Sequence, residues 1–361
     1  MAFSLNFYPI VYRAKFAKDK WKGAYLEKPH KTPAEEAAMK GPKLDALIAA
    51  KNFYDDMPLI SYTTQYGLSC FEGMKAYPQA NGGLSLFRPE QNAARFARSM
   101  KGLYMPPFPE DMFLKAVVET VKRNAKLGFR PQYKKEWEKD SFANAASIYL
   151  RPYVHTEGGF GITISKEPYV VIVSSPVTIF LPKSDAGVVV NDRIRATPNG
   201  TGWIKSASNY VISTLAKHEA NLAGFTETIF LDAVDRKYVE ECSACNIFFY
   251  LKSGELVTPE LGDTILPGIT RASIVELARD KKIKASERKI SIDEVMDEAQ
   301  ECFLCGTAVG LVPIPAITYK KKKVVFCKGQ TGETTAMLRD TLKGIQYGLI
   351  PDTKGWMVKV V

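Results

Sequence analysis

Long apolar stretches are missing from this sequence of 361 residues. No apolar run reaches the ~18 residues that a membrane-spanning helix needs, so we expect no membrane partner. The apolar start of the chain precedes its first basic residues, whereas a secretory signal has the opposite order, and we therefore expect a cytoplasmic location. No segment repeats at a fixed period, which argues against a solenoid or a propeller.

Nucleotide- and metal-binding motifs are also scarce. The sequence contains no GxGxxG and no P-loop, and its three histidines have neither metal-ligand nor triad spacing. Two CxxC pairs are present, but 56 residues separate them, far more than a zinc ribbon allows. We expect buried, inert thiols and no metal, with zinc binding or a redox role as the alternatives, for the pairs Cys242/Cys245 and Cys302/Cys305.

Positive charge is in excess but is not concentrated. The formal net charge is +10, which suits anionic small molecules. Only residues 320–323 form a basic run, and no nucleic-acid-binding motif accompanies it, so we expect no nucleic-acid partner.

The length and the order of predicted elements indicate a two-domain α/β (α+β) protein. The turn-rich residues 182–187 are predicted to be a linker between a small N-terminal domain, residues 1–181, and a larger C-terminal domain, residues 188–361. Within the first domain, residues 32–39 and 42–50 are predicted to be helical and the rest of the first 52 residues an irregular arm. Residues 60–77 alternate like a strand pair.

The best-defined pattern is the loop at residues 195–205 (RATPNGTGWIK), which ends in Lys205 just before an amphipathic helix. Its glycines permit a tight backbone path, and Ser208 or Asn209 can cap the helix. Lys205 lies near Arg195 in sequence and precedes a helix start, so it is a candidate for Schiff-base chemistry. The helix is predicted to span about residues 210–223, and its expected buried side carries Val211, Leu215, Ala216, Ala220 and Leu222.

Three further features accompany this lysine. Residues 268–271 (GITR) open a helix and residues 306–308 (GTA) follow a strand, so both could present backbone N–H groups to an anion. Arg95 and Arg151 lie where a domain would bury them only with a partner. Glu240 and Glu241 end a strand, and the residues alone do not distinguish them. A lysine, anion cradles and a strand-end carboxylate together suit pyridoxal phosphate.

Seven segments resemble the branched-chain amino acid aminotransferases of pyridoxal phosphate fold type IV. They occur in family order and near family spacing between about residues 58 and 348. The segments are residues 70–77 (CFEGMKAY), 86–89 (LFRP), 149–152 (YLRP), 199–210 (NGTGWIKSASNY), 238–246 (YVEECSACN), 265–271 (ILPGITR) and 306–308 (GTA).

The resemblance implies roles for residues that would bind pyridoxal 5'-phosphate. Lys205 would form the internal aldimine and carry the proton during catalysis, and Glu241 would pair with the protonated pyridine nitrogen. Tyr210 would contact the ring oxygen, and Arg195 would be a nearby positive charge. The phosphate would be held by Arg95, Ile269, Thr270 and Thr307.

The resemblance also implies the substrates and the assembly. The enzyme would transfer the amino group of leucine, isoleucine or valine to 2-oxoglutarate by ping-pong kinetics. It would act as a homodimer whose active site lies near the subunit interface. Carboxylates would be received by Thr307, Ala308, Tyr66 and Arg151, and the side-chain pocket would be walled by Phe71, Tyr149, Ala244 and Cys245.

Two departures from the family pattern are visible. Val309 and Val312 occupy places where some animal members carry a CxxC, and Ala244 stands where a hydroxyl is frequent. The alternatives on the same fold are a D-amino acid or (R)-amine transaminase and an aminodeoxychorismate lyase. An alternative of another class is a zinc or nucleic-acid module.

Overall fold

The computed structural model describes residues 5–53, 57–178 and 187–361. Residues 182–186 of the predicted linker lie outside the described residues. The chain forms two compact units: unit 1 comprises Met1–Phe180, Ser206–Ser208 and Ile345–Val361, and unit 2 comprises Leu181–Lys205 and Asn209–Gly344. The units differ from the predicted domains in that Ser206–Ser208 and Ile345–Val361 group with unit 1. Within the described ranges, no helix combines the length and apolarity that a membrane crossing requires.

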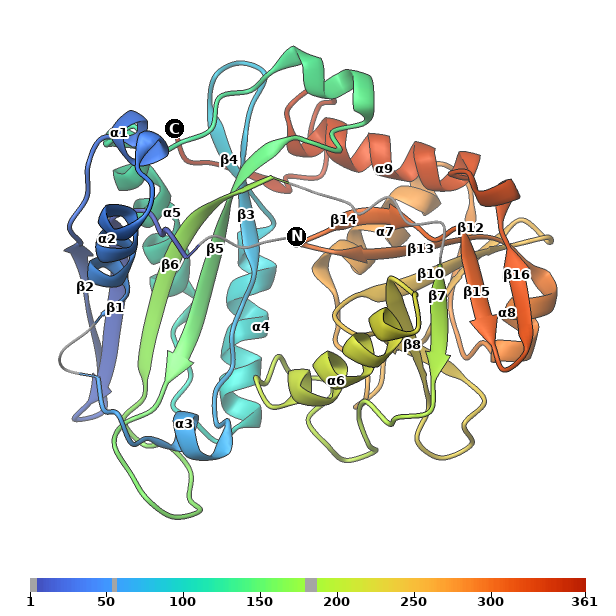
Figure 1. Ribbon diagram of the computed structural model, residues 1–361, viewed down its shortest axis with the longest axis horizontal. Helices are drawn as coiled ribbons and strands as arrows, with labels where there is room; N and C mark the ends of the chain where they lie inside the picture. Colours follow the sequence, from blue (N-terminus) through green and yellow to red (C-terminus); the bar gives the residue numbers. More distant parts are fainter. Residues whose placement is uncertain (1–4, 54–56, 179–186) are drawn as a thin grey trace. The chain divides into compact units, whose positions relative to one another are not determined.

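Unit 1 is built on a seven-stranded sheet with the order β17-β4-β3-β5-β6-β1-β2 (Figure 1). All of its neighbouring strands run antiparallel. Its strands are β1 (Ile10–Ala17), β2 (Lys20–Glu27), β3 (Met74–Pro78), β4 (Leu84–Phe87), β5 (Ala146–His155), β6 (Tyr169–Thr178) and β17 (Met357–Lys359).

The hairpin β1–β2 corrects the prediction of an irregular arm. Its turn residues Lys18 and Asp19 both have positive φ values, 50° and 58°. Such a two-residue turn matches the twist of the flanking strands, but glycine or asparagine usually signals it. The prediction was wrong because a Lys-Asp turn carries no such signal. The two predicted helices of this region are present as α1 (Pro33–Ala38) and α2 (Pro42–Asn52).

Of the strand pair predicted for residues 60–77, the second strand is present as β3, whereas the first is wrong because the chain there forms the helix α3 (Tyr62–Tyr66). Ser61 caps α3 through the N–H of Thr64, and the Thr64 side chain in turn accepts a hydrogen bond from the N–H of Ser61. Gly67 ends the helix in the left-handed conformation. This reciprocal cap outweighs the alternation that suggested strands.

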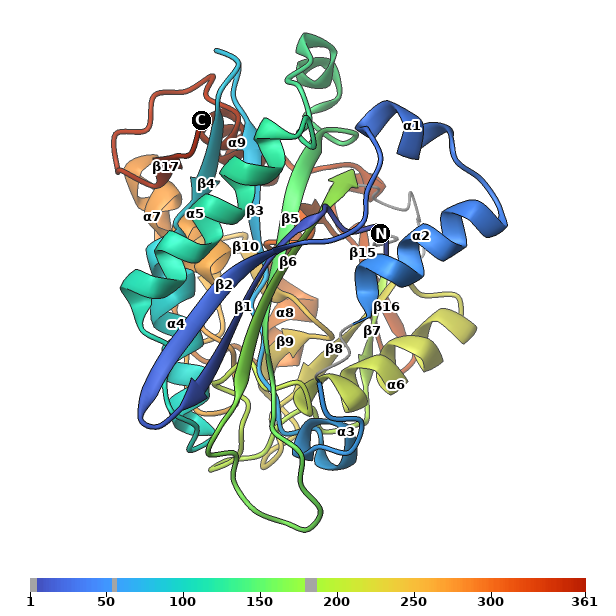
Figure 2. The same ribbon diagram turned by 90° about the vertical axis from the view of Figure 1, so that its left-hand side faces the viewer.

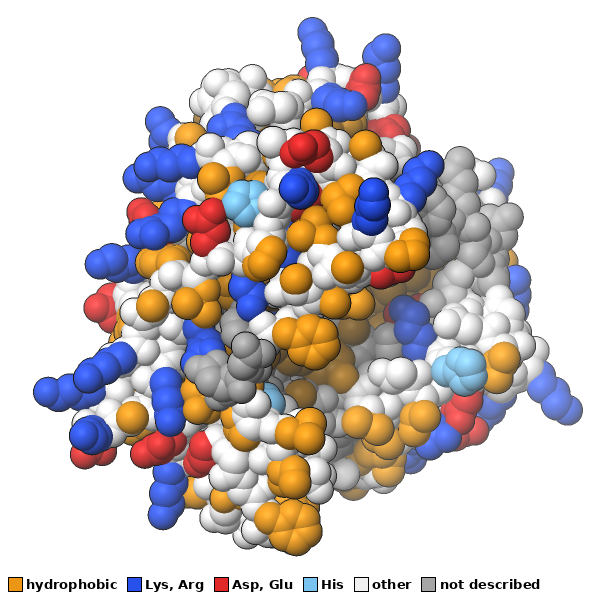
Figure 3. All heavy atoms as spheres, turned by 60° about the vertical axis from the view of Figure 1, so that its left-hand side comes forward, with side chains coloured by type: hydrophobic (Ala, Val, Ile, Leu, Met, Phe, Trp, Pro, Cys, Tyr) orange, Lys and Arg blue, Asp and Glu red, His pale blue; other side chains and the backbone are white. Residues whose placement is uncertain are grey.

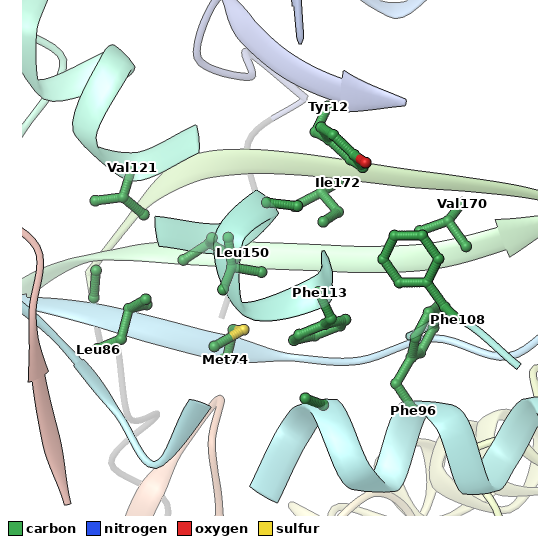
Figure 4. Close-up of a cluster of buried hydrophobic side chains, with 14 of the residues drawn as sticks. Tyr12, Met74, Leu86, Phe96, Phe108, Phe113, Val121, Leu150, Val170 and Ile172 are labelled. Carbon is green, nitrogen blue, oxygen red and sulfur yellow. The ribbon is translucent and has the colours of Figure 1, made fainter. Parts of the chain in front are cut away.

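Two longer helices, α4 (Pro89–Gly102) and α5 (Glu110–Lys126), pack against each other, and α5 lies on β1 and β6 (Figures 1 and 2). Their apolar sides bury Phe96, Phe113 and Val121 against the sheet residues Leu150 and Ile172 (Figure 4). Each such buried side chain contributes ~1.5–3 kcal/mol. Unit 1 also contains the 3₁₀ helix η1 (Lys135–Asp140).

Unit 2 contains two five-stranded sheets, with the orders β12-β11-β10-β13-β14 and β16-β15-β7-β8-β9. A single core joins them, in which Ile229 and Ile317 of one sheet cluster with Phe249 and Leu304 of the other. The strands are β7 (Val188–Asn191), β8 (Glu227–Leu231), β9 (Val239–Cys242), β10 (Asn246–Leu251), β11 (Glu255–Thr258), β12 (Lys284–Glu287), β13 (Ala299–Gly306), β14 (Gly310–Pro313), β15 (Ala316–Tyr319) and β16 (Lys322–Val325). The α/β fold class is therefore confirmed.

The remaining helices follow these strands. They are α6 (Asn209–Leu222), α7 (Ile269–Asp280), α8 (Ile292–Glu298), α9 (Glu333–Gln346) and the 3₁₀ helix η2 (Cys327–Gly329).

The buried side of α6 matches the prediction in part: Ala216 and Ala220 are buried as predicted, but the larger apolar residues are not. Its large apolar residues are exposed: Val211 by 61%, Leu215 by 44% and Leu222 by 77%. Ser213, which was not predicted to be buried, joins Ala216 and Ala220 on the side of the helix that packs on β7 and β8. Small side chains let α6 approach the sheet closely. The helix therefore packs on the sheet through its small residues and leaves its larger apolar residues exposed.

Basic side chains are spread over the face seen in Figure 3, interspersed with acidic ones. The distribution agrees with the scattered charge of the sequence. Orange apolar side chains also reach this surface.

Lys343 of α9 is only 3% exposed, so its positive charge is expected to lower the stability of the folded protein. Burial, and then the nearby Arg339, lower the pKa of Lys343 to about 7. Between this value and the ordinary 10.5, the unfolded chain binds more protons, so stability rises with pH. We expect Lys343→Met to raise the free energy of unfolding by ~2 kcal/mol near pH 6.

The gain from Lys343→Met should shrink as the pH rises above 7, and urea unfolding at several pH values measures it. Lys281→Met removes an exposed lysine and is the matched control. An equal gain in the free energy of unfolding at every pH would show that burial of the Lys343 charge does not destabilise the protein.

Candidate active site

The loop at residues 195–205 is held against residues 263–268 of unit 2. The Arg195 guanidinium donates to the carbonyl oxygen of Thr264, and the Asn199 N–H donates to the Asp263 carboxylate. Gly202 packs so closely on Thr264 that an added Cβ would lie 2.5 Å from its carbonyl oxygen. Three attachments thus fix the path of the chain that delivers Lys205.

Lys205 is half-buried, and its Nζ donates a hydrogen bond to the Tyr210 hydroxyl at 2.7 Å. Tyr210 lies in the first turn of α6. The preceding residue, Asn209, donates through its side chain to the carbonyl oxygens of Thr201 and Ile204, which fastens the helix start to the loop. The predicted neighbours Lys205 and Tyr210 are therefore in contact.

Glu241, the third residue of β9, is 5% exposed. Its Oε1 lies 2.8 Å from Arg195 Nη2 and accepts the Leu266 N–H at 3.3 Å, while Oε2 accepts the Asn246 side-chain amide at 3.1 Å. Burial raises the pKa of Glu241, and the charges of Arg195 and Lys205 oppose this rise. The structure therefore brings Arg195, Lys205 and Glu241 together.

Asn246 is a site residue that the sequence interpretation missed. It opens β10, is 7% exposed, and also donates to the Leu266 carbonyl at 3.1 Å. Its side chain occupies the place that a Cβ on Gly268 would need, which explains the glycine there. A polar residue at the first position of an otherwise apolar strand was the available signal.

The start of α7 supplies an anion cradle on the same unit. Ile269 and Thr270 are its first two residues and are both buried. No side chain caps this end of α7, and its first turn contains no acidic residue. Its N–H groups and the positive end of the helix dipole can therefore receive a phosphate.

The turn at residues 306–308 lies next to Ala244 and Cys245. Thr307 and Ala308 lie in the turn between β13 and β14 and are half-buried. A Cβ on Gly306 would lie 3.7 Å from Cys245 Sγ and 3.9 Å from the Ala244 carbonyl oxygen. The predicted residues Ala244, Cys245, Thr307 and Ala308 therefore lie on contiguous segments.

A cavity of about 340 Å³ lies beside Tyr210 and Ala244. α6 contributes hydrophilic side chains to this cavity, and of the predicted pocket residues Ala244 contributes to its lining. The predicted apolar pocket for the substrate side chain stays a prediction. The lining residues are Tyr210, Ser213, Thr214, Lys217, His218, Asn221, Ser243 and Ala244.

Within unit 1, Phe71, Tyr149 and Arg151 form one cluster. Arg151 Nη2 donates to the Tyr149 hydroxyl at 3.1 Å, and its guanidinium lies 4.6 Å from the centre of the Phe71 ring. Tyr149 and Arg151 are two residues apart on β5 and therefore share a face of the strand. Among the described residues, Arg151 Nε is buried without a hydrogen-bond partner, so this donor is available to an anionic ligand.

Tyr66 contacts a different part of unit 1. It ends α3, is 45% exposed, and its hydroxyl accepts the Gly161 N–H at 3.2 Å. The link that the sequence suggested between Tyr66 and a substrate carboxylate stays a prediction.

Arg95 is 5% exposed on α4 and forms a bidentate ion pair with Glu72. Its Nε donates to Glu72 Oε1 at 2.7 Å and its Nη2 to Oε2 at 2.8 Å. Asn92 and the Gly73 N–H also donate to Oε2. The sequence interpretation assigned no role to Glu72, and the phosphate role of Arg95 stays a prediction.

The two CxxC pairs contain free, buried thiols. Burial raises the pKa of Cys245 to about 12 and raises the pKa of Cys242, Cys302 and Cys305 well above the ordinary value. In the described part of the chain, no three His, Cys, Asp or Glu side chains are grouped to hold a metal ion.

Thiol reactivity tests this description, because the thiolate is the attacking form. Cys327 is the exposed cysteine of the six. We expect one rapid equivalent with a chromogenic disulfide reagent in the native protein and six after denaturation. Cys327→Ser should abolish the rapid phase. A second rapid thiol would indicate a reactive CxxC pair.

Comparisons with known proteins show which family this chain belongs to. Residues 69–317 match the family model described as amino-transferase class IV. The branched-chain-amino-acid aminotransferase of Mycolicibacterium smegmatis is 38% identical over 307 residues, which cover 82% of this chain and 80% of that protein.

Solved structures match as well. The branched-chain amino acid aminotransferase of Escherichia coli has a TM-score of 0.72 and 26% identity, and the match covers 85% of this chain and 95% of that one. The T.th. branched-chain amino acid aminotransferase complexed with N-(5'-phosphopyridoxyl)-L-glutamate has a TM-score of 0.71 and 27% identity, over 85% of this chain and 94% of that one. This chain therefore belongs to the class IV aminotransferase family, as its motifs predicted.

Proposed function

We propose that this protein is a pyridoxal 5'-phosphate-dependent aminotransferase that moves the amino group of leucine, isoleucine or valine to 2-oxoglutarate. The observation that carries the proposal is the contact of Lys205 Nζ with the Tyr210 hydroxyl, in the same unit as the buried Glu241. The branched-chain relatives and the phosphopyridoxyl-glutamate complex of a solved structure support the choice of substrates.

The residues of unit 2 fit this cofactor. Glu241 is a buried acid whose raised pKa would return toward its ordinary value beside a protonated pyridine nitrogen. The uncapped start of α7, with Ile269 and Thr270, suits the phosphate, and Thr307 of the neighbouring turn and Arg95 are further candidates to hold it. Tyr210 would donate to the ring oxygen, and Arg195 would act through Glu241.

When bound, pyridoxal phosphate supplies an aldehyde carbon that amines attack and a ring that withdraws electrons from the substrate Cα. Lys205 would hold this aldehyde, and its Nζ would accept the Cα proton of the substrate and return it. The Tyr210 hydroxyl keeps the amine oriented at 2.7 Å.

Substrate carboxylates are expected to bind at two places. The backbone N–H groups of Thr307 and Ala308 would receive the α-carboxylate, because a tight turn can direct successive N–H groups to one anion. Arg151, with its unpartnered Nε and its bond to Tyr149, would receive the second carboxylate of 2-oxoglutarate. Phe71, Tyr149, Ala244 and Cys245 would contact the substrate side chain, and Tyr66 would assist at the carboxylate.

We also propose a homodimer whose active site lies near the subunit interface. Unit 1 exposes apolar side chains on two adjoining segments that a bridge between Ser61 and Gly158 joins. Leu59 is exposed by 89%, Phe160 by 86% and Ile162 by 95%. Such a patch favours association with another protein surface.

The six free cysteines suit a reducing compartment, and a cytoplasmic location is part of the proposal.

The rival activities are separated by their substrates. A D-amino acid or (R)-amine transaminase would prefer D-alanine to L-leucine, and an aminodeoxychorismate lyase would release pyruvate and ignore 2-oxoglutarate. We expect turnover of L-leucine with 2-oxoglutarate, measured as glutamate formed.

The role of Lys205 is tested by Lys205→Ala. We expect turnover to fall by ~10⁴-fold or more, because the group that binds the aldehyde and moves the proton is lost. The circular dichroism spectrum should not change. Lys281→Ala, at an exposed lysine, is the matched control.

Borohydride reduction of the holoenzyme, followed by peptide mapping, gives a readout that does not depend on turnover. The pyridoxyl group should be found on Lys205. An adduct on another lysine, or full activity in Lys205→Ala, would refute the proposal.

The proposed role of Arg151 predicts a selective loss. We expect Arg151→Met to lower kcat/KM for 2-oxoglutarate by ~10–100-fold, since a carboxylate loses a charged hydrogen-bond partner. The value for 4-methyl-2-oxopentanoate should change by less than ~3-fold, because its side chain carries no charge. Arg123→Met, at an exposed arginine, is the control. Equal losses for both oxo acids would remove Arg151 from this role.

A further inference from the structure

A second cavity of about 340 Å³ lies in unit 2, between the β8–β9 connection and residues 259–265. Five carboxylates and one lysine contribute to its lining, so its charge is predominantly negative. The acidic residues are Asp232, Asp235, Glu240, Glu260 and Asp263, and the basic residue is Lys289.

Glu240 is the buried acid of this cavity, with an exposure of 7%. Its Oε1 accepts the Thr264 hydroxyl at 2.6 Å. Its Oε2 is buried without a hydrogen-bond partner among the described residues. Leaving a buried carboxylate oxygen unsatisfied is costly, so a ligand that donates to it would be stabilised.

Two other acids of the cavity are satisfied within the protein. The Asp232 carboxylate accepts the N–H groups of Asp235, Lys237 and Tyr238. Asp263 accepts the Asn199 N–H. These bonds hold two of the negative charges in place, Asp235 and Glu260 are exposed, and Glu240 Oε2 is the buried acceptor that has no partner among the described residues.

The remaining wall is largely apolar, and it includes Pro198, Val234, Val239, Leu261 and Ile265. A cavity of this volume is far larger than a single inorganic ion, and its apolar surface would gain nothing from one. An alkyl chain against this wall and a cationic head at Glu240 would satisfy both parts.

We propose that this cavity binds a small organic cation, an alkyl ammonium or alkyl guanidinium compound, whose charged head donates to Glu240 Oε2. The site is separate from the proposed transamination chemistry, because Glu240 and Glu241 are successive strand residues whose side chains point to opposite faces of β9.

Calorimetric titration of the holoenzyme with hexylguanidinium tests the proposal. A guanidinium is chosen because a primary amine would condense with the aldehyde of the cofactor. Saturable binding is expected, whereas 1-hexanol, potassium chloride and magnesium chloride should give no saturable heat. The cofactor absorbance reports separately on the proposed active site.

Two variants locate the binding. Glu240→Gln keeps the shape of the side chain and removes its charge, and we expect affinity to fall at least ~10-fold. Val234→Trp changes a residue that is 73% exposed, so folding should be retained while the bulky ring blocks the cavity. Glu110→Gln, at an exposed glutamate of unit 1, is the matched control and should bind like the parent.

Three results would overturn the proposal. They are equal binding of hexylguanidinium and 1-hexanol, unchanged affinity in both Glu240→Gln and Val234→Trp, and saturable binding of an inorganic cation alone. Loss of cofactor absorbance without loss of hexylguanidinium binding would count against the transaminase proposal only.

Discussion

The buried carboxylate of Glu241 sets the strictest physical requirement in unit 2. An ionised carboxylate can leave water only if positive charge and hydrogen-bond donors replace its hydration. Arg195, the Leu266 N–H and the Asn246 amide supply these donors at 2.8–3.3 Å. They come from three separate segments, so the carboxylate fixes the loop before Lys205, the start of β10 and the segment before α7 relative to one another.

The same requirement explains several sequence choices around the site. Gly202 lets the lysine loop approach Thr264, and Gly268 leaves room for Asn246, so both glycines serve close approach within one network. Asn209 then ties α6 to the loop, which places the Tyr210 hydroxyl at Lys205 Nζ. The Lys205 amine is therefore positioned by packing and hydrogen bonds, and the Glu241 carboxylate is held in the same network. Such preorganisation is what a cofactor enzyme contributes to the chemistry of its cofactor.

The sequence predicted elements with strong local signals and failed where distant contacts decide. The helices predicted at residues 32–39 and 42–50 are present as α1 and α2. The β1–β2 hairpin was missed because its turn lacks glycine. The prediction for α6 was right for Ala216 and Ala220 and wrong for its larger apolar residues, because small side chains pack on the sheet. The contacts between Arg95 and Glu72 and between Asn246 and Glu241 could not be predicted, because hydrophobic periodicity gives no information on which polar side chains meet in the fold.

Glu240 and Glu241 show most clearly what tertiary structure adds. In sequence they are adjacent glutamates at a strand end, and nothing local separates them. Strand alternation directs them to opposite faces, and the loops on each face then give them different partners. Glu241 receives a guanidinium, a backbone N–H and an amide. Glu240 receives the Thr264 hydroxyl, and its other oxygen has no partner in the part of the chain that the structure describes. Thr264 connects the two environments, since its hydroxyl binds Glu240 while its carbonyl oxygen accepts from Arg195. A change of charge at Glu240 would therefore act on the residue that holds the cation paired with Glu241.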